Sequence, residues 1–390
     1  MTSTQQMGAR EAESHAGKLP ESGRFGPLVA GLASLDRPER GFPVRGLEAL
    51  RQSGLWSAGL TATDGGPDLD GPALLRLMRL VGRASLPLGR LFEGHVNALA
   101  LISAYGAPAQ RARVAAEAGA GRLFGVWNTE GPDGVRLIQG GLRLEGAKTF
   151  ASGGRHVTRP LLPVDGEGGR QLVLLRADAP ESRVREVSGS WQPMGMEGTE
   201  SVKLDFSGSR LAPDDLIGGA GDYYRQPMFS AGALRFCAVQ LGGADRLLTE
   251  VRGYLRRLGR HGDEVQALRF AGCWTGLHGA WLALAEGERL ERGVLYSGGD
   301  EGRLLAQVDA VRLMTEDACL ALLEASERAV GARGLLEPEP FGRLIRDLRM
   351  YLRQPAPDAA RLRLGHWLLG RPPESDWEAD DREAEHVREG

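Results

Sequence analysis

The sequence predicts an α+β protein of several domains, in which a central antiparallel β domain separates an N-terminal helical domain from a C-terminal four-helix bundle. Apolar residues recur at helical spacing over 25–121, short alternating runs separated by Gly and Pro fill 122–221, and long helical patterns return over 222–370. This order indicates segregated domains rather than an alternating α/β sheet. We expect 1–24 to be a disordered lead and 371–390 a disordered acidic tail.

Within the N-terminal part, LEALRQSGLW (47–56) carries apolar residues at helical spacing, and Gly, Pro and Asp mark a loop over 61–72. An amphipathic helix follows this loop. The nearly apolar run HVNALALISAYG (95–106) predicts a buried helix that ends at Gly106.

The C-terminal part contains three helical patterns that exceed the usual globular length, over 229–259, 265–290 and 303–331. Helices of this length predict a packed bundle. A fourth helix is expected from about Gly342 to the prolines Pro355 and Pro357, and the helical pattern resumes after them.

Composition places the chain among ordinary globular proteins. Of 390 residues, 42% are hydrophobic and 25% charged, and the net charge is −3. Nothing in this balance favours nucleic acid or an anionic membrane as a partner. The three cysteines lie in apolar helical contexts, which fits a reducing cytoplasm, and no apolar run is long enough to span a membrane. We therefore expect a cytoplasmic protein.

Several common catalytic motifs are absent from the sequence. No G-x-G-x-x-G follows a strand, and there is no P-loop and no G-x-S-x-G elbow. The seven histidines are scattered without the spacing of metal ligands, so we expect no metal site. These absences disfavour the usual NAD enzymes and hydrolases.

Four segments in order resemble the acyl-CoA dehydrogenase family, over about residues 45–365. The first runs from a helix into a strand that ends in Thr-Glu. The second is a G-x-K-x-aromatic strand, the third a G-M-x-x-Thr/Ser strand, and the fourth a Gly-rich turn followed by Arg-Asp. In this sequence they read LISAYGAPAQRARVAAEAGAGRLFGVWNTEG, LRLEGAKTFASGG, WQPMGMEGTESVKLDFSGSRLAPDDLIG and GARGLLEPEPFGRLIRDLR.

The resemblance implies an FAD cofactor held at the ends of two β-domain strands. By position, Thr129 would reach the flavin pyrimidine, Ser152 would donate to N5, and Phe150 would pack on the ring in place of the family's Trp. Trp127 and Asn128 would place backbone amides nearby. The competing interpretation is that Thr129 and Ser152 are ordinary strand-end hydroxyls.

The resemblance also implies that a neighbouring subunit completes the cofactor site. Arg256, Arg257 or Arg260, together with Gln266, are the candidates for the FAD pyrophosphate, and Arg260 is the arginine we select; a solvated basic helix end is an equal alternative. Gly331 and Gly334 match the turn that receives the adenine. Arg346 and Asp347 match the Arg-Asp pair, and we interpret them as residues of an intrahelical or interhelical structural ion pair.

The catalytic glutamate of the family is missing at both of its known positions. Those positions hold Pro355 and Leu234, so Asp358 is the nearest substitute in sequence. α-Proton abstraction requires a carboxylate whose pKa is tuned by burial. The acyl-CoA-facing turn is altered as well, since Val135 and Arg136 replace its Ser and Asp.

Three hypotheses follow from this pattern. The leading one is an FAD-dependent, acyl-CoA dehydrogenase-like oxidoreductase that acts on an acyl-CoA or related small molecule with a non-standard base. The second is a flavin monooxygenase-like member of the same fold, and the third a catalytically inactive binding or scaffold protein. The resemblance implies a homodimer or tetramer in each case.

Overall fold

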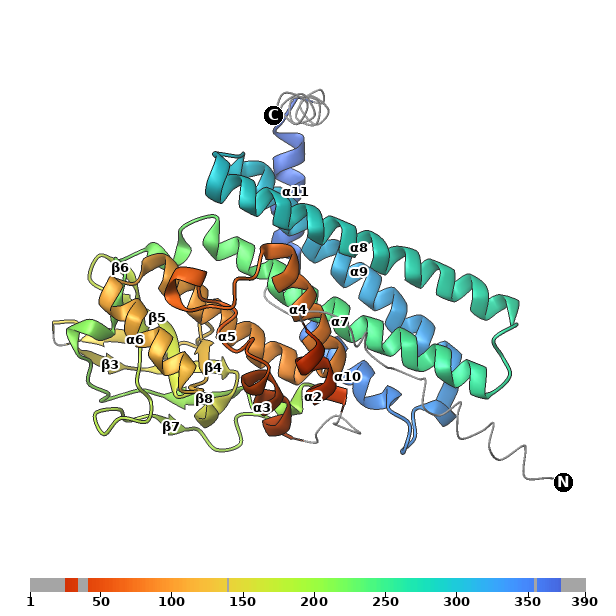
Figure 1. Ribbon diagram of the computed structural model, residues 1–390, viewed down its shortest axis with the longest axis horizontal. Coiled ribbons are helices and arrows are strands. Elements are labelled where there is room, and N and C mark those ends of the chain that lie inside the picture. The colour runs from red at the N-terminus through yellow and green to blue at the C-terminus, as the bar shows by residue number, and fades with distance from the viewer. Residues whose placement is uncertain (1–24, 34–40, 139, 354–355, 373–390) are drawn as a thin grey trace.

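The computed structural model describes residues 25–33, 41–138, 140–353 and 356–372. The predicted disordered lead (1–24), most of the predicted tail (371–390) and Pro355 lie outside these described residues. Figure 1 shows the two sheets at one end of the molecule and the long C-terminal helices extending away from them.

The N-terminal part is helical, as predicted. The buried run that begins at His95 is the second half of a longer helix, which starts directly after the Ser85 cap. The Ser85 hydroxyl accepts from the Leu88 amide, and Pro87 lies in the first turn, where a missing N–H costs nothing. The helices are α2 (Gly26–Ala33), α3 (Val44–Gln52), α4 (Gly71–Ala84), α5 (Leu86–Tyr105) and α6 (Pro108–Gly119).

Two sheets form the central part. The larger has the strand order β3-β2-β5-β6-β9 with β1 beside β5, and the smaller has the order β4-β8-β7. The strands are β1 (Phe124–Val126), β2 (Arg136–Ile138), β3 (Arg143–Glu145), β4 (Ala147–Ala151), β5 (Arg159–Gly166), β6 (Gly169–Leu174), β7 (Arg185–Glu186), β8 (Val202–Asp205) and β9 (Leu216–Ile217).

The prediction of an antiparallel β domain holds for most of these strand pairs. β1 and β2, however, both pair with β5 in parallel. The connection from β1 to β5 passes through the smaller sheet, which returns the chain beside β1 in the same direction. The same route brings the end of β4 back beside the end of β1.

The described residues of the C-terminal part form the helices α7 (Met228–Arg257), α8 (Glu264–Ser297), α9 (Glu301–Gly334), α10 (Phe341–Tyr351) and α11 (Pro357–Leu369). The glycine pair inside α7 marks its crossing with α4. A Cβ on Gly242 would lie 2.0 Å from the Arg79 carbonyl oxygen, and one on Gly82 would lie 2.2 Å from the Val239 carbonyl oxygen. The two backbones touch because glycine occupies both sides of the crossing.

His95 joins the helical and β parts as a buried, neutral bridge. Its Nε2 donates to the Trp56 carbonyl oxygen at 2.9 Å, and its Nδ1 accepts from the Phe124 amide at 3.1 Å. Burial lowers the pKa of His95 to about 3. The unfolded chain, with an ordinary histidine pKa of about 6.5, therefore takes up the extra proton first as the pH falls.

His95 should make the protein acid-sensitive. Between pH 6.5 and 3 the unfolded state is the more protonated, so unfolding becomes easier by about 1.4 kcal/mol for each pH unit below 6.5. In urea titrations at pH 7 and pH 5, His95→Gln should lose about 2 kcal/mol less stability on acidification than the wild type. His278→Gln, on the exposed face of α8, should retain the wild-type loss. Equal losses in His95→Gln and wild type would contradict the bridge.

Candidate functional site

The structure brings together the two strand ends that carry the predicted flavin-binding residues. The Trp127 indole Nε1 donates to the Ser152 carbonyl oxygen at 2.9 Å, and the Thr149 amide donates to the Thr129 carbonyl oxygen at 2.9 Å. Asn128 and Thr129 therefore lie beside the segment that holds Phe150 and Ser152. The Trp127 amide was expected to face the cofactor, but it donates to the Leu161 carbonyl oxygen at 3.1 Å and is not available.

Phe150 offers an exposed aromatic face. Its backbone is left-handed (φ 53°), which is unusual for a bulky residue, and its side chain is 55% exposed. Trp191 packs edge-on against its ring at a centroid distance of 6.2 Å, and the exposed Met194 follows on the same loop. A planar ring could stack on this surface without displacing any core side chain.

Ser152 is nearly buried beside Phe150 and is linked to two hydroxyls that the sequence analysis missed. Its Oγ lies 2.9 Å from the Ser201 Oγ, which lies 2.7 Å from the Thr199 Oγ1. The Thr129 hydroxyl, by contrast, is exposed and has no hydrogen-bond partner among the described residues. An exposed aromatic ring, one free hydroxyl and one networked hydroxyl fit the ring and polar edge of a flavin.

A buried network of charged side chains holds the 127–130 segment in place. The fully buried Lys148 ammonium donates to Glu130 and to the Pro163 carbonyl oxygen, both at 2.6 Å, and to the Asn128 carbonyl oxygen at 3.4 Å. Arg170 pairs with the same Glu130. Burial lowers the pKa of Lys148, and the charge of Glu130 opposes that shift.

A second polar network lies between the helices α5 and α7. Arg90 and Asn97 each donate to one oxygen of the buried Glu93 carboxylate, and Arg235 donates to the Asn97 side-chain oxygen. Arg235 also lies 3.9 Å from Glu291, and burial raises the pKa of Glu291. Both Glu93 oxygens are occupied by donors, which suits a positioning role better than proton abstraction.

Tyr351 of α10 adds an unpaired hydroxyl to this network. Its side chain is almost fully buried, and its hydroxyl has no hydrogen-bond partner in the described part of the chain. Burial raises the pKa of Tyr351, and the neighbouring Glu93 charge adds to that rise. A buried polar atom without a partner is unusual, so the hydroxyl is a candidate for binding a small molecule.

Removing this hydroxyl should stabilise the free protein. Tyr351→Phe is expected to raise the free energy of unfolding by about 1 kcal/mol, since an unsatisfied buried hydroxyl carries a desolvation cost. Tyr296→Phe, at an 81% exposed tyrosine on α8, should change it by less than about 0.5 kcal/mol. Denaturant titration measures both, and a clear loss of stability in Tyr351→Phe would show that the hydroxyl has a partner.

The candidate positions for a dehydrogenase base do not supply one. Leu234 is buried in the core and packs against Gly287. Asp358 is exposed in the first turn of α11, so burial does not tune it as proton abstraction requires. Pro355 lies outside the described residues, and its side chain carries no carboxylate.

The turn that corresponds to the acyl-CoA-facing turn of the dehydrogenases packs against the β domain. Val135 is fully buried, and Arg136 pairs with Glu145 at 3.1 Å on the surface. A pocket of about 390 Å³ opens beside this turn, and Asp133 and Lys203 on its wall pair with each other at 2.7 Å. These charged groups satisfy one another and leave little to bind a CoA.

The residues predicted to bind the pyrophosphate and adenine of FAD lie together, but they are far from the strand ends. Arg260 belongs to the α7–α8 turn, Gln266 to the first turn of α8, and Gly331 and Gly334 to the end of α9, at the end of the bundle opposite the sheets (Figure 1). Arg260 donates to Asp263 at 3.0 Å. With its amide oxygen turned toward its donors, Gln266 accepts from Arg260 and Arg269, both at 3.1 Å. Within one chain these groups satisfy one another.

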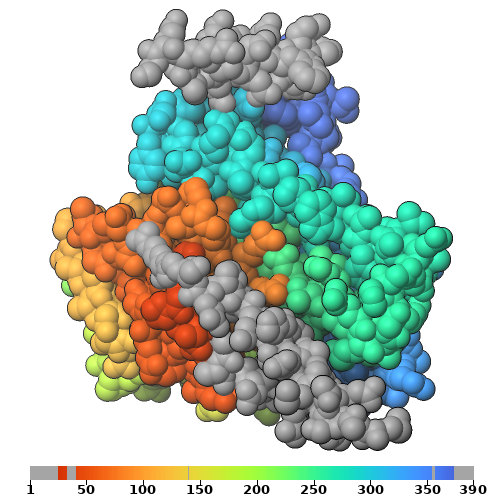
Figure 2. All heavy atoms as spheres, turned by 45° about the vertical axis from the view of Figure 1, so that its right-hand side comes forward, coloured from red at the N-terminus to blue at the C-terminus, as the bar shows by residue number. Residues whose placement is uncertain are grey.

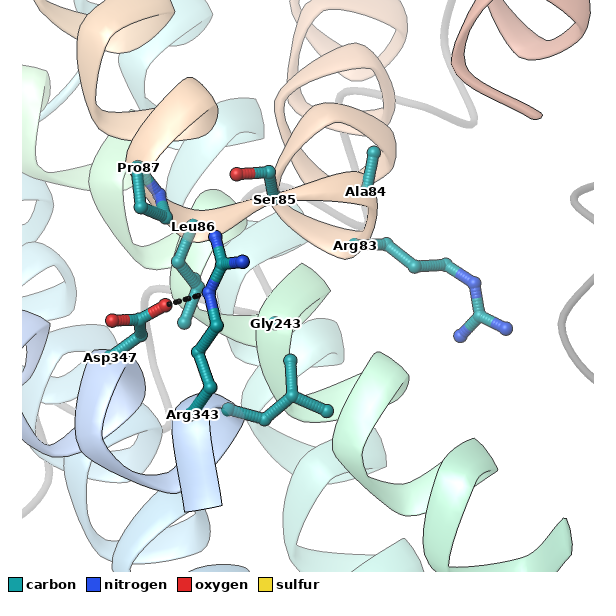
Figure 3. A pocket seen from close by; sticks show the side chains of 10 residues that line it. Arg83, Ala84, Ser85, Leu86, Pro87, Gly243, Arg343 and Asp347 are labelled. Atoms are coloured by element: carbon teal, nitrogen blue, oxygen red, sulfur yellow. Dashed lines mark ion pairs between the residues drawn. The ribbon is translucent and has the colours of Figure 1, made fainter. Parts of the chain in front are cut away.

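Asp347 forms a structural ion pair within α10, and its partner is Arg343 rather than the adjacent Arg346. Asp347 pairs with Arg343, one helical turn earlier, at 3.5 Å, because adjacent residues on a helix do not face each other. Figure 3 shows Arg343 and this ion pair beside the α4–α5 junction. Asp347 also accepts from the Met196 amide at 2.6 Å, which fastens the 194–199 loop to α10.

Two further properties concern the described residues only. No three His, Cys, Asp or Glu side chains in this part of the chain gather in a way that could hold a metal ion. None of its helices combines the length and apolar character that crossing a membrane requires.

This combination of helical domain, two-sheet β domain and helical bundle is the acyl-CoA dehydrogenase fold, which confirms the predicted fold class. TdsC from Paenibacillus sp. A11-2, solved with FMN and indole, superposes with a TM-score of 0.79 at 22% identity, covering 90% of this chain and 97% of TdsC. The 3-HSA hydroxylase of Rhodococcus sp. RHA1 gives a TM-score of 0.77 at 17% identity, covering 90% and 98%.

In sequence, the chain is similar to dibenzothiophene monooxygenase of Rhodococcus erythropolis, with 25% identity over 340 residues, 78% of this chain and 81% of that enzyme. No family model matches the chain. The resemblance to acyl-CoA dehydrogenases thus holds for the fold, whereas the named relatives are a monooxygenase and a hydroxylase rather than dehydrogenases.

Proposed function

We propose that this protein is a flavin-dependent monooxygenase with the acyl-CoA dehydrogenase fold. The main support is a contrast between two sets of residues. Phe150 and Ser152 provide an aromatic ring and a hydroxyl for a flavin, whereas the positions expected for a dehydrogenase base, Leu234 and Asp358, provide no buried carboxylate. This contrast favours the second sequence hypothesis over acyl-thioester dehydrogenation. The similarity to dibenzothiophene monooxygenase supports the same choice.

We propose FMN rather than FAD as the cofactor. TdsC was solved with FMN, and Arg260 and Gln266, the residues expected to bind the FAD pyrophosphate, are engaged with their own neighbours. Phe150 would stack on the flavin ring, Ser152 would face N5, and Thr129 would reach the pyrimidine. Reduced flavin, when bound, supplies the electrons that split O₂, with one oxygen atom entering the substrate and the other leaving as water.

The substrate would lie between this flavin surface and the α5–α7 polar network. Arg90 uses one of its N–H groups on Glu93 and remains about one-fifth exposed, and the Tyr351 hydroxyl is unpaired. These donors suit a small molecule that carries a hydrogen-bond acceptor. The occupied oxygens of Glu93 would hold Arg90 in place.

We propose that two or more copies associate through the C-terminal bundle. Helix α8 lies on the outer surface (Figure 2), and its exposed face includes Leu268 and Trp274, which are 77% and 55% exposed. Large apolar side chains exposed along one helix are typical of a protein interface. Light scattering that gives a monomer mass would contradict this.

Isotope labelling distinguishes the proposed activity from dehydrogenation. Protein supplied with chemically reduced FMN, ¹⁸O₂ and a panel of aromatic compounds that includes indole and dibenzothiophene should give at least one product with a single ¹⁸O atom. Under anaerobic conditions, acyl-CoA compounds should leave the oxidised flavin coloured. Bleaching of the flavin by an acyl-CoA, with formation of an enoyl product, would overturn the proposal.

A further inference from the structure

Three buried hydroxyls form a continuous chain that leads away from the flavin surface. The Ser152 Oγ is 2.9 Å from the Ser201 Oγ, and the Ser201 Oγ is 2.7 Å from the Thr199 Oγ1. The Thr199 hydroxyl then donates to the Met196 carbonyl oxygen at 2.8 Å. All three side chains are less than a tenth exposed, so water does not compete for these bonds.

The backbone around the chain is held in a strained conformation. Phe150, Met196 and Glu200 are non-glycine residues with φ of 53°, 59° and 43°, and they account for three of the four such residues in the described part of the protein. Left-handed conformations at such residues are costly and concentrate at functional sites. The Gly153 amide donates to the Thr199 carbonyl oxygen at 2.7 Å and locks the two turns together.

Each hydroxyl has one proton, so an unbroken series of hydrogen bonds through the three hydroxyls can run in only two directions. When Thr199 donates to Met196, Ser201 must donate to Thr199 and Ser152 to Ser201, so Ser152 offers only lone pairs to the flavin surface. When the order reverses, Thr199 donates to Ser201, Ser201 to Ser152, and the Ser152 proton points outward. The Met196 carbonyl oxygen still accepts from the Thr199 amide at 3.0 Å, so the reversal leaves no orphaned acceptor.

We propose that Ser152, Ser201 and Thr199 form a reversible hydrogen-bond relay that matches both protonation states of the flavin N5. This inference rests on the proposed function, because it places Ser152 at N5. The outward proton would donate to the bare N5 of oxidised flavin, and the inward order would let Ser152 accept from the N5–H of reduced flavin. No heavy atom needs to move between the two states.

The relay should favour reduced flavin. With N5–H as the donor, the Thr199–Met196 hydrogen bond is kept, whereas with bare N5 it is lost. The inward order therefore has one additional hydrogen bond. Thr199 and Ser201 act through Ser152 and are positioning residues, and they set the redox preference of the site without touching the flavin.

Thr199→Val removes the inner hydroxyl without a change of shape. Oxidised FMN should bind as it does to the wild type, and reduced FMN should bind about fivefold to tenfold more weakly, because the inward order loses its acceptor for the Ser201 proton. Anaerobic equilibrium titrations with FMN and with dithionite-reduced FMN give both dissociation constants. Thr199→Ser, which restores a hydroxyl, should return their ratio to the wild-type value.

Thr158→Val is the matched control, since its buried hydroxyl has no partner in the described structure and lies outside the relay. Its ratio of dissociation constants should equal that of the wild type. An unchanged ratio in Thr199→Val, with both forms of FMN bound, would overturn the relay and leave the proposed function standing. Failure of the wild type to bind either form would instead overturn the proposed function. If Thr199→Val does not fold, Ser201→Ala is measured in its place, with the same expected shift.

Discussion

Lys148→Met should destabilise the protein by about 3 kcal/mol. The Lys148 ammonium is fully buried and donates to Glu130, Pro163 and Asn128, so the substitution leaves a partly buried carboxylate and two carbonyl oxygens without their shared donor. Removal of one partner from a buried ion pair is far more costly than loss of a surface pair. Because Asn128 and Glu130 flank Thr129, we also expect weaker flavin binding.

Lys203→Met is the matched control for this substitution. Lys203 pairs with Asp133 at 2.7 Å, but both side chains are substantially exposed, so the loss should be below about 1 kcal/mol. Denaturant titration of both variants gives the comparison. Similar small losses in the two would show that the Lys148 network does not support the 127–130 segment.

Gly195→Ala should be comparably harmful, for a steric reason. A Cβ at this position would lie 2.1 Å from the Arg346 carbonyl oxygen and 2.8 Å from the Asp347 amide nitrogen, and backbone atoms cannot move aside as a flexible side chain can. The 194–199 loop would have to separate from α10 and give up the Met196–Asp347 hydrogen bond. We expect a loss of about 3 kcal/mol, at the upper end of overpacking effects.

Gly272→Ala provides the comparison on α8. A Cβ there would meet nothing within 4 Å, and the residue is helical and exposed. Replacing an exposed helical glycine with alanine should stabilise the protein by about 0.5–1 kcal/mol. Thermal melts of the two variants should therefore shift in opposite directions. A neutral Gly195→Ala would contradict the close contact between the loop and α10.

The fold was readable from the sequence because its signals are local. Helical periodicity over 229–259 and alternation over 122–221 report which face of each element is buried, and the order of the elements gives the class of fold. The parallel pairing of β1 with β5 could not be read in this way. It depends on the long path of the chain through the second sheet.

The site was only partly readable, for a similar reason. Phe150 and Ser152 could be proposed because they belong to one strand-end motif, but Ser201 reaches Ser152 only through the pairing of β4 with β8, about fifty residues apart in sequence. The left-handed backbone at Met196 and Glu200 has no glycine to mark it. Spacing alone also could not reveal that Arg260 and Gln266 bind each other.

The choice between dehydrogenase and monooxygenase depended on burial rather than on residue type. Asp358 was a reasonable substitute base from its position in sequence, but its carboxylate is exposed. Glu93, which the sequence analysis did not consider, is buried, yet its two oxygens are taken by Arg90 and Asn97. Neither carboxylate therefore combines burial with a free oxygen, as a base that removes a proton requires.

Titration of FMN with the purified protein, followed by visible absorption and flavin fluorescence, tests the central claim most directly. The wild type should perturb the flavin bands, and Phe150→Ala should bind FMN about tenfold more weakly, because the ring loses its stacking partner. Leu369→Ala, at an even more exposed apolar residue of α11, should bind FMN like the wild type. An unchanged FMN spectrum at saturating protein, or identical binding by wild type and Phe150→Ala, would contradict the assignment of this surface to a flavin.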